Sequence, residues 1–177
     1  VAGSQPITLK HPIASQMNVL RSTLIGGLIS NLQFNLNRKQ ARVRLFEIGC
    51  CFIRNEENDC KQIDKLAGLS YGDIVFEQWG IPARSVDFFD VKADVEVLYG
   101  NQKIYFKKFS HPALHPGKSA QIYLEDKSIG WLGELHPHWQ KKYGLQKNAI
   151  LFEVDLESLL PKSLPIAREI SKFPPIR

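Results

Sequence analysis

The sequence predicts an α+β fold in which an antiparallel β-sheet is flanked by helices. A long amphipathic helical segment comes first, a second helix follows two β-prone segments, and most of the remaining chain consists of short strand-like runs. Elements that lack a regular βαβ alternation favour antiparallel pairing. A length of 177 residues fits a single domain over residues 1–177, and a hydrophobic fraction of 44% is enough to build a core.

The first helix is predicted over residues 22–37, because leucines recur every four positions from Leu24 to Leu36. This spacing gives an apolar stripe wide enough to face a core. Two glycines weaken the first turn, and Ser22 or Thr23 could cap it.

The middle of the chain predicts two strands and a second helix. Residues 42–53 and, more weakly, residues 62–71 are rich in β-prone side chains, and a polar loop joins them. The second helix is expected over residues 87–99, where Asp87 can cap the first turn. Its buried face is predicted to carry Phe88, Val91, Val95 and Leu98.

The last part of the chain is dominated by strands. Four are expected, over residues 103–109, 120–124, 129–135 and 149–154. Turn-forming residues at 125–128 join the middle two into a hairpin. Short helices are expected over residues 137–143 and 156–160. Residues 1–15 are interpreted as an extended lead-in, and residues 161–177 as a linker toward a following domain.

The basic excess of the chain lies in its first third. The net charge is +5, but residues 1–54 carry seven Lys and Arg against one acidic residue, whereas residues 55–177 carry 16 against 17. This asymmetry favours an anionic partner such as RNA. A solvated face or a protein interface explains it as well. No apolar run approaches the ~20 residues that cross a bilayer, so no membrane association is expected.

Five cations are candidates for contact with RNA or with a partner chain. In a strand, Arg42 and Arg44 point to the same face, beside the end of the first helix. A cationic face can hold phosphates, and it can also pair with carboxylates of another chain. No aromatic residue is interleaved, so base stacking is not supported. The candidate contact residues are Arg21, Arg38, Lys39, Arg42 and Arg44.

No pattern in the sequence predicts a catalytic, cofactor-binding or metal site. His111 and His115 are four residues apart, but the prolines between and after them forbid the regular helix that would aim both at one metal. This segment is expected instead to form a rigid turn that presents histidine, a glycine backbone and Lys118. Phosphate-binding loops and nucleophile elbows are missing from the sequence.

The cysteines are expected to be free buried thiols in a reducing cytosol. Cys50 and Cys51 are adjacent, and neighbouring strand residues point to opposite faces, so they are poorly placed to share a bond or a metal. The third cysteine, Cys60, makes the number odd.

Several short motifs, in order along nearly the whole chain, resemble one family. The segments at residues 11–24 are similar to the opening of the core domain of the bacterial phenylalanyl-tRNA synthetase beta subunit. Further similarities are HPGKSA at residues 115–120, IGWLGELHP at residues 129–137 and SKFPPIR at residues 171–177.

The resemblance implies a class II aminoacyl-tRNA synthetase-like fold in a non-catalytic copy. Residues 45–56 are similar to the strand and loop of class II motif 2, which usually ends in FRxE. Here Ile53 stands between Phe52 and Arg54, which sends the Arg54 side chain to the opposite strand face. The Gly-rich motif 3 is also missing, so this domain alone is expected to be inactive.

In that family the active site belongs to the alpha subunit of a cytoplasmic α2β2 ligase. The resemblance therefore implies the alpha subunit, a second beta subunit and tRNA(Phe) as partners, with ATP and Mg used at the level of the holoenzyme. The leading hypothesis is an assembly domain that docks the alpha subunit through the helix at residues 22–37 and the strand at residues 42–52. The alternative is direct tRNA binding through the basic cluster at residues 38–44.

Overall fold

A computed structural model describes residues 6–14, 17–54 and 59–160 of the chain. Its helices are α1 (Ile25–Leu36), α2 (Phe88–Tyr99), α3 (Pro137–Lys142) and the short 3-10 helix η2 (Leu156–Leu159). Its strands are β1 (Val43–Arg54), β2 (Cys60–Tyr71), β3 (Ile104–Lys108), β4 (Leu114–Leu124), β5 (Lys127–Leu135) and β6 (Ala149–Asp155). The predicted α+β class is confirmed.

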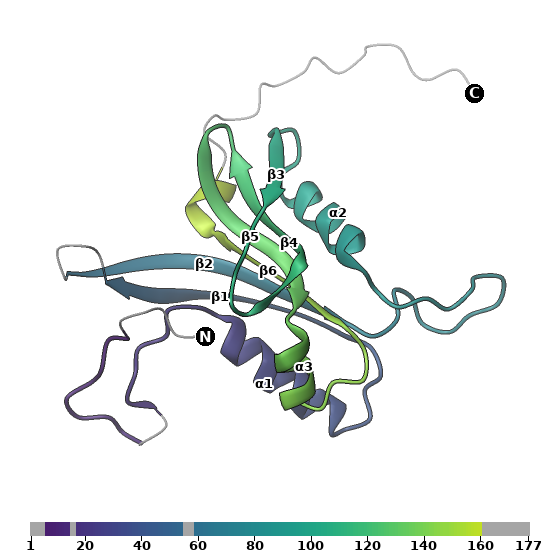
Figure 1. Cartoon of the computed structure of the whole chain (residues 1–177), viewed down its shortest axis with the longest axis horizontal. Coiled ribbons are helices and arrows are strands. Elements are labelled where there is room, and N and C mark those ends of the chain that lie inside the picture. Colours follow the sequence, from purple (N-terminus) through teal and green to yellow (C-terminus); the bar gives the residue numbers. More distant parts are fainter. Residues whose placement is uncertain (1–5, 15–16, 55–58, 161–177) are drawn as a thin grey trace, which may run out of the picture.

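The strands form one sheet in the order β1-β2-β6-β5-β4-β3, and every neighbouring pair is antiparallel (Figure 1). Helix α1 packs on one face, with α3 beside it. Helix α2 packs on the opposite face, over β5 and β6. Because side chains alternate along a strand, each of these two cores takes every second residue of the central strands.

Helix α1 begins at Ile25, later than predicted, and its first turn is held from outside the helix. Leu24 occupies the N-cap position but makes no cap bond through its own side chain. Its backbone N–H donates to Oε2 of Glu153 at 2.8 Å, and the Thr23 hydroxyl donates to the same oxygen at 2.6 Å. The helix start is therefore held by a carboxylate of β6 together with the predicted Thr23, whose hydroxyl accepts from the Ile25 N–H at 3.3 Å.

Helix α2 has the predicted cap but a different buried stripe. Asp87 and Asp90 form a capping box, in which each side chain accepts from the backbone of the other residue. The prediction that Leu98 is buried was wrong, because its side chain is 45% exposed while Tyr99 is 3% exposed. The stripe continues in steps of four from Val91, and the Tyr99 hydroxyl reaches Ser158 of η2 at 2.6 Å.

Strand β4 begins at Leu114, not at Ala120. The predicted turn is confirmed at residues 111–114, where the Leu114 N–H donates to the His111 carbonyl at 2.9 Å, but residues 115–118 belong to the strand. Leu114 pairs with Leu135 and Ser119 pairs with Gly133, which leaves residues 115–118 opposite a single residue of β5. This segment is a bulge of several residues, a feature that accommodates a proline without an N–H donor inside a sheet. The predicted β4–β5 hairpin is confirmed, with its turn at residues 125–126.

The described part of the lead-in folds back on the chain that follows it. Thr8 forms an isolated bridge with Val19, and the Leu9 N–H donates to the Asn18 carbonyl at 2.8 Å. The predictions for residues 1–5 and for the linker at 161–177 lie outside the described residues. Among the helices of the described part, none is long and apolar enough to cross a membrane.

Candidate functional site

Arg42 and Arg44 lie on one side of β1, as predicted, and both hold the loop that follows β2. Arg42 donates from Nε to the Asp73 carbonyl at 3.1 Å and from Nη2 to the Ile74 carbonyl at 3.1 Å. Arg44 donates to the carbonyls of Tyr71 at 2.7 Å and Asp73 at 3.0 Å. Burial, and secondly the charge of Arg42, lowers the pKa of Arg44 below its ordinary value. Both guanidinium groups therefore stabilise the fold by holding this loop against β1.

The other three candidate cations lie apart from this pair. Arg21 donates to Glu47 at 2.5 Å and to the Cys50 carbonyl at 2.8 Å, so it braces the outer edge of β1. Arg38 lies over the Phe34 ring, 3.3 Å from its centroid, and Lys39 is exposed in the turn after α1 with φ of 63°. Arg21, Arg38 and the Arg42–Arg44 pair therefore contact three different parts of the chain.

Strand β1 is an edge strand with an apolar side that α1 does not cover. Val43 and Cys51 face the α1 core and are 5% and 0% exposed. On the opposite face, Phe46 is 75% exposed and Ile48 is 57% exposed. Large apolar side chains on an edge strand are a template for association with another surface. Arg54 ends this strand opposite Cys60.

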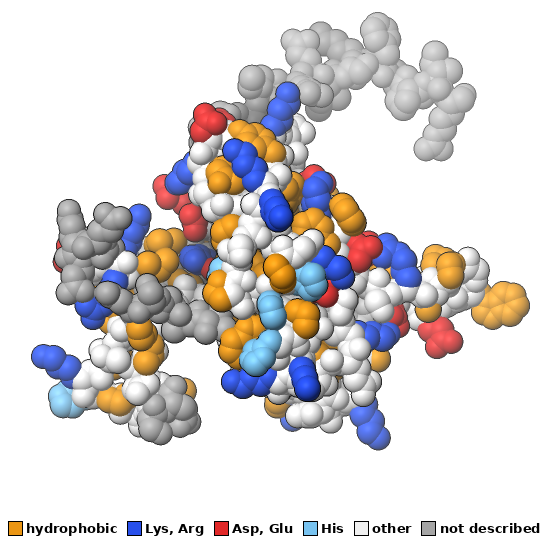
Figure 2. All heavy atoms as spheres, viewed as in Figure 1, with side chains coloured by type: hydrophobic (Ala, Val, Ile, Leu, Met, Phe, Trp, Pro, Cys, Tyr) orange, Lys and Arg blue, Asp and Glu red, His pale blue; other side chains and the backbone are white. Residues whose placement is uncertain are grey.

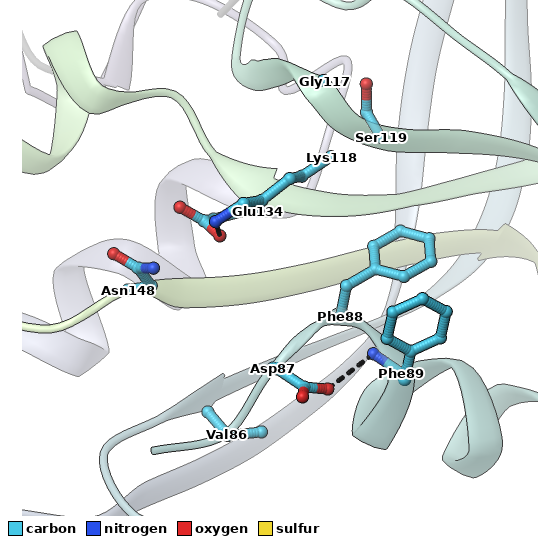
Figure 3. Close-up of a pocket in the computed structure, with 9 residues that line it drawn as sticks. All are labelled: Val86, Asp87, Phe88, Phe89, Gly117, Lys118, Ser119, Glu134 and Asn148. Carbon is cyan, nitrogen blue, oxygen red and sulfur yellow. Dashed lines mark hydrogen bonds and ion pairs between the residues drawn. The ribbon is translucent and has the colours of Figure 1, made fainter. Parts of the chain in front are cut away.

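A cavity of about 350 Å³ lies between the start of α2 and the β4 bulge (Figure 3). The rings of Phe88 and Phe89 lie on one side of it, and Lys118, Glu134 and Asn148 lie on the other. Lys118 and Glu134 form an ion pair at 2.8 Å, and the Glu134 side chain is 7% exposed. The motifs HPGKSA and IGWLGELHP, found separately in the sequence, therefore meet here.

His111 and His115, four residues apart in the sequence, make separate contacts. The His111 ring stacks between Phe109 and Trp131 at 6.0 and 5.5 Å, and burial lowers its pKa. His115 accepts from the Gly117 N–H at 3.0 Å. Within residues 6–14, 17–54 and 59–160, no group of three His, Cys, Asp or Glu side chains could hold a metal ion.

The prediction of buried thiols holds for only one cysteine. Cys51 is 0% exposed under α1, Cys50 lies on the opposite face and is partly exposed, and Cys60 is exposed. The strand alternation was predicted correctly, but Cys60 opens β2 at the far end of the β1–β2 hairpin, beyond the reach of either core.

The three thiols are expected to react with N-ethylmaleimide in a fixed order, Cys60 first and Cys51 last. Burial raises the pKa of Cys51 to about 11. At pH 8 only about one Cys51 in a thousand is then a thiolate, the reactive form. Mass spectrometry of timed samples should show Cys51 labelled only after urea is added. Rapid labelling of Cys51 in native Cys60→Ser protein would contradict this order.

Sequence reasoning missed two buried carboxylates. Glu153 is 3% exposed and accepts from Lys65 at 2.7 Å, in addition to its bonds at the start of α1. Glu134 is 5% exposed. The sequence does contain a signal for them. Glu134 and Glu153 each lie among apolar residues in a short strand, on the face that the alternation of side chains assigns to the core. A charged residue at such a position indicates a buried partner.

The sheet and its helices define a class of fold. The chain is similar to a pyrrolysyl tRNA synthetase from Desulfitobacterium hafniense, with a TM-score of 0.60 and 17% identity over 88% of this chain and 52% of that chain. At this identity the likeness concerns the fold, which is that of a class II aminoacyl-tRNA synthetase-like domain.

The sequence comparisons identify the family. Residues 2–156 match the family described as "Phenylalanyl tRNA synthetase beta chain CLM domain". The chain is 57% identical over its whole length to the phenylalanine–tRNA ligase beta subunit of Nitrosospira multiformis, and 49% identical over 99% of its length to that of Dechloromonas aromatica. The chain belongs to this family. It spans 22% and 23% of the lengths of these two relatives.

Proposed function

We propose that the chain is a non-catalytic assembly domain of a phenylalanine–tRNA ligase beta subunit and docks the catalytic alpha subunit. In the proposed cytoplasmic α2β2 enzyme, the alpha subunit charges tRNA(Phe) with the use of ATP and Mg. Similarity to curated beta subunits over the whole chain supports this role.

The observation that carries the proposal is the uncovered side of β1. Phe46 and Ile48 stand on an edge strand, 75% and 57% exposed, on the face opposite α1. Fully burying one large apolar side chain contributes about 1.5–3 kcal/mol. On the outer side of α1, Phe34 is also 54% exposed. An apolar surface of this kind suits a permanent protein interface.

The contacts of the basic residues favour assembly over direct tRNA binding. Arg42 and Arg44 direct donors at the carbonyls of residues 71–74, and Arg21 is paired with Glu47. Phosphate contacts need cations that are free to replace counterions. Within the cluster at residues 38–44, this leaves Arg38 and Lys39 as the exposed cations. Two cations are few for a surface that binds RNA.

Co-purification of the full beta chain with a tagged alpha subunit tests the proposal. The double variant Phe46→Ser/Ile48→Ser is expected to bind alpha roughly 100-fold more weakly than the wild type, because two apolar side chains lose their burial. Val97→Ser on α2 removes a side chain that is 78% exposed and serves as the matched control. Circular dichroism of each variant checks that the fold is intact.

Two outcomes would overturn the assignment. The first is activation of phenylalanine with ATP by the beta chain without any alpha subunit. The second is tRNA binding at low salt by the beta chain that is lost in Arg38→Ala/Lys39→Ala, while alpha binding is unaffected by the double serine variant. The second result would favour the RNA-binding alternative.

A further inference from the structure

The loop between β2 and α2 carries the most exposed aromatic side chain among the described residues. We name residues 74–84 the Trp79 loop. Its Phe76, Trp79 and Ile81 side chains are 73%, 102% and 50% exposed. The loop projects from the body of the protein at the right of Figure 1, and hydrophobic side chains gather at its outer end in Figure 2. Such a cluster on a protruding element indicates an interaction site.

The base of the Trp79 loop is closed like a hairpin. Asp73 and Ser85 form a bridge, and the Ile74 N–H donates to the Arg84 carbonyl at 3.0 Å. The Val86 N–H donates to the Gly72 carbonyl at 2.9 Å. The two ends of the loop are therefore held next to each other at the surface of the fold.

Four charged side chains brace this base from different elements. Arg42 and Arg44 of the β1 side hold the carbonyls of residues 71–74. Lys147 pairs with Asp73 at 2.7 Å, and the hydrogen bond from Lys147 lowers the pKa of the Asp73 carboxyl. Arg84 pairs with Asp90 of α2 at 2.6 Å. A braced loop loses little conformational freedom on binding, which favours affinity.

The charge of the loop selects the kind of partner. The loop carries two charged side chains, Glu77 and Arg84, and Arg84 is paired with Asp90 at the base. Glu77, in the outer part of the loop, would repel a phosphate backbone or an anionic membrane surface. Trp and other aromatic residues surrounded by neutral side chains are typical of the centre of protein interfaces. The matching surface is an apolar protein pocket with a Lys or Arg at its rim, opposite Glu77.

The Trp79 loop is continuous with the apolar side of β1. The Arg42 guanidinium lies over the Phe76 ring, 4.9 Å from its centroid. Arg42 and Arg44 are followed on the same side of β1 by Phe46 and Ile48, because alternate strand residues share a face. One partner that covers β1 can therefore reach the loop.

We infer that Trp79 is the anchor by which this domain inserts into an apolar pocket of the alpha subunit. This inference rests on the proposed function, which names that subunit as the partner. The loop contributes the central buried side chain, and β1 contributes the flanking apolar surface. Truncation of such an anchor typically weakens binding by 2 kcal/mol or more, which is about a 30-fold change in affinity.

The experiment measures the affinity of the full beta chain for the alpha subunit in parallel for three chains. Trp79→Ser is expected to weaken binding about 30-fold. Gln78→Ala, its exposed neighbour, is the matched control and should bind as the wild type does. As a second readout, chymotrypsin should cut the wild-type loop after Phe76 and Trp79 in the free beta chain, and the alpha subunit should slow this cleavage at least tenfold.

The outcomes separate this inference from the proposed function. If wild-type beta does not bind alpha, both fail. If alpha binds the wild type and Trp79→Ser equally, and the loop stays open to chymotrypsin in the complex, only the Trp79 inference fails. If Trp79→Ser instead lowers tRNA binding and leaves alpha binding unchanged, the loop contacts RNA and the inference is overturned.

Discussion

Replacing Glu153 with alanine is expected to lower the free energy of unfolding by about 3–5 kcal/mol. The Glu153 carboxylate accepts from the Leu24 N–H, the Thr23 hydroxyl and the Lys65 ammonium, at 2.8, 2.6 and 2.7 Å. The variant would leave an unpaired ammonium whose side chain is 14% exposed, and a buried N–H without an acceptor. Both lost interactions lie where α1 contacts the centre of the sheet.

Urea unfolding of the chain, followed by tryptophan fluorescence, measures this effect. Glu157→Ala removes an exposed carboxylate of η2 and should change the free energy of unfolding by no more than about 0.5 kcal/mol. The double variant Glu153→Gln/Lys65→Met removes both charges and should be more stable than Glu153→Ala. A loss below about 1 kcal/mol for Glu153→Ala would show that the network does not hold α1.

The Glu153 network also explains how far the sequence could predict the start of α1. The apolar stripe from Leu24 to Leu36 was sufficient to predict the helix, because it depends on local spacing. The true acceptor for the Leu24 N–H comes from β6, 129 positions along the chain. Local propensity contains no information about a partner at that distance, so the sequence predicted the contribution of Thr23, which accepts from the Ile25 N–H at 3.3 Å, but not that of Glu153.

The same limit applies to the candidate contact residues. Alternation predicted Arg42 and Arg44 on one face, and both donate to the Asp73 carbonyl, although Arg42 lies just before β1. Their acceptors are carbonyls of the loop after β2, and only the antiparallel pairing of Val43 with Tyr71 brings that loop within reach. The clustering of charge in the sequence therefore singled out Arg42 and Arg44, but it did not show whether they contact their own chain or a partner.

The β4 bulge illustrates a second case, in which the predicted turn was right for residues 111–114 and wrong for the residues that follow. Two prolines and a glycine within residues 112–117 argued against regular structure, and a turn was predicted. The bulge keeps the segment in the sheet and aims Lys118 at Glu134, 2.8 Å away. Strand continuation on both sides of a proline depends on the neighbouring strand, β5, and is not encoded locally.

Replacing Gly130 with alanine is expected to lower the free energy of unfolding by about 3 kcal/mol. An added Cβ would lie 2.2 Å from the Glu153 carbonyl oxygen and 2.7 Å from the Val154 Cα. Both atoms belong to the backbone of β6, which cannot move aside as a flexible side chain can. The close approach follows a register shift in which Ile122 pairs with Gly130 and Tyr123 pairs with Ser128.

The same substitution at Gly26 should have the opposite sign, and this contrast makes the test specific. An added Cβ at Gly26 meets no atom within 4 Å, on the exposed side of α1, so Gly26→Ala should raise the free energy of unfolding by about 0.5–1 kcal/mol. Urea unfolding of both variants gives the two values directly. Equal stability of Gly130→Ala and the wild type would contradict the register of β5 against β6, since only that pairing brings the β6 backbone against Gly130.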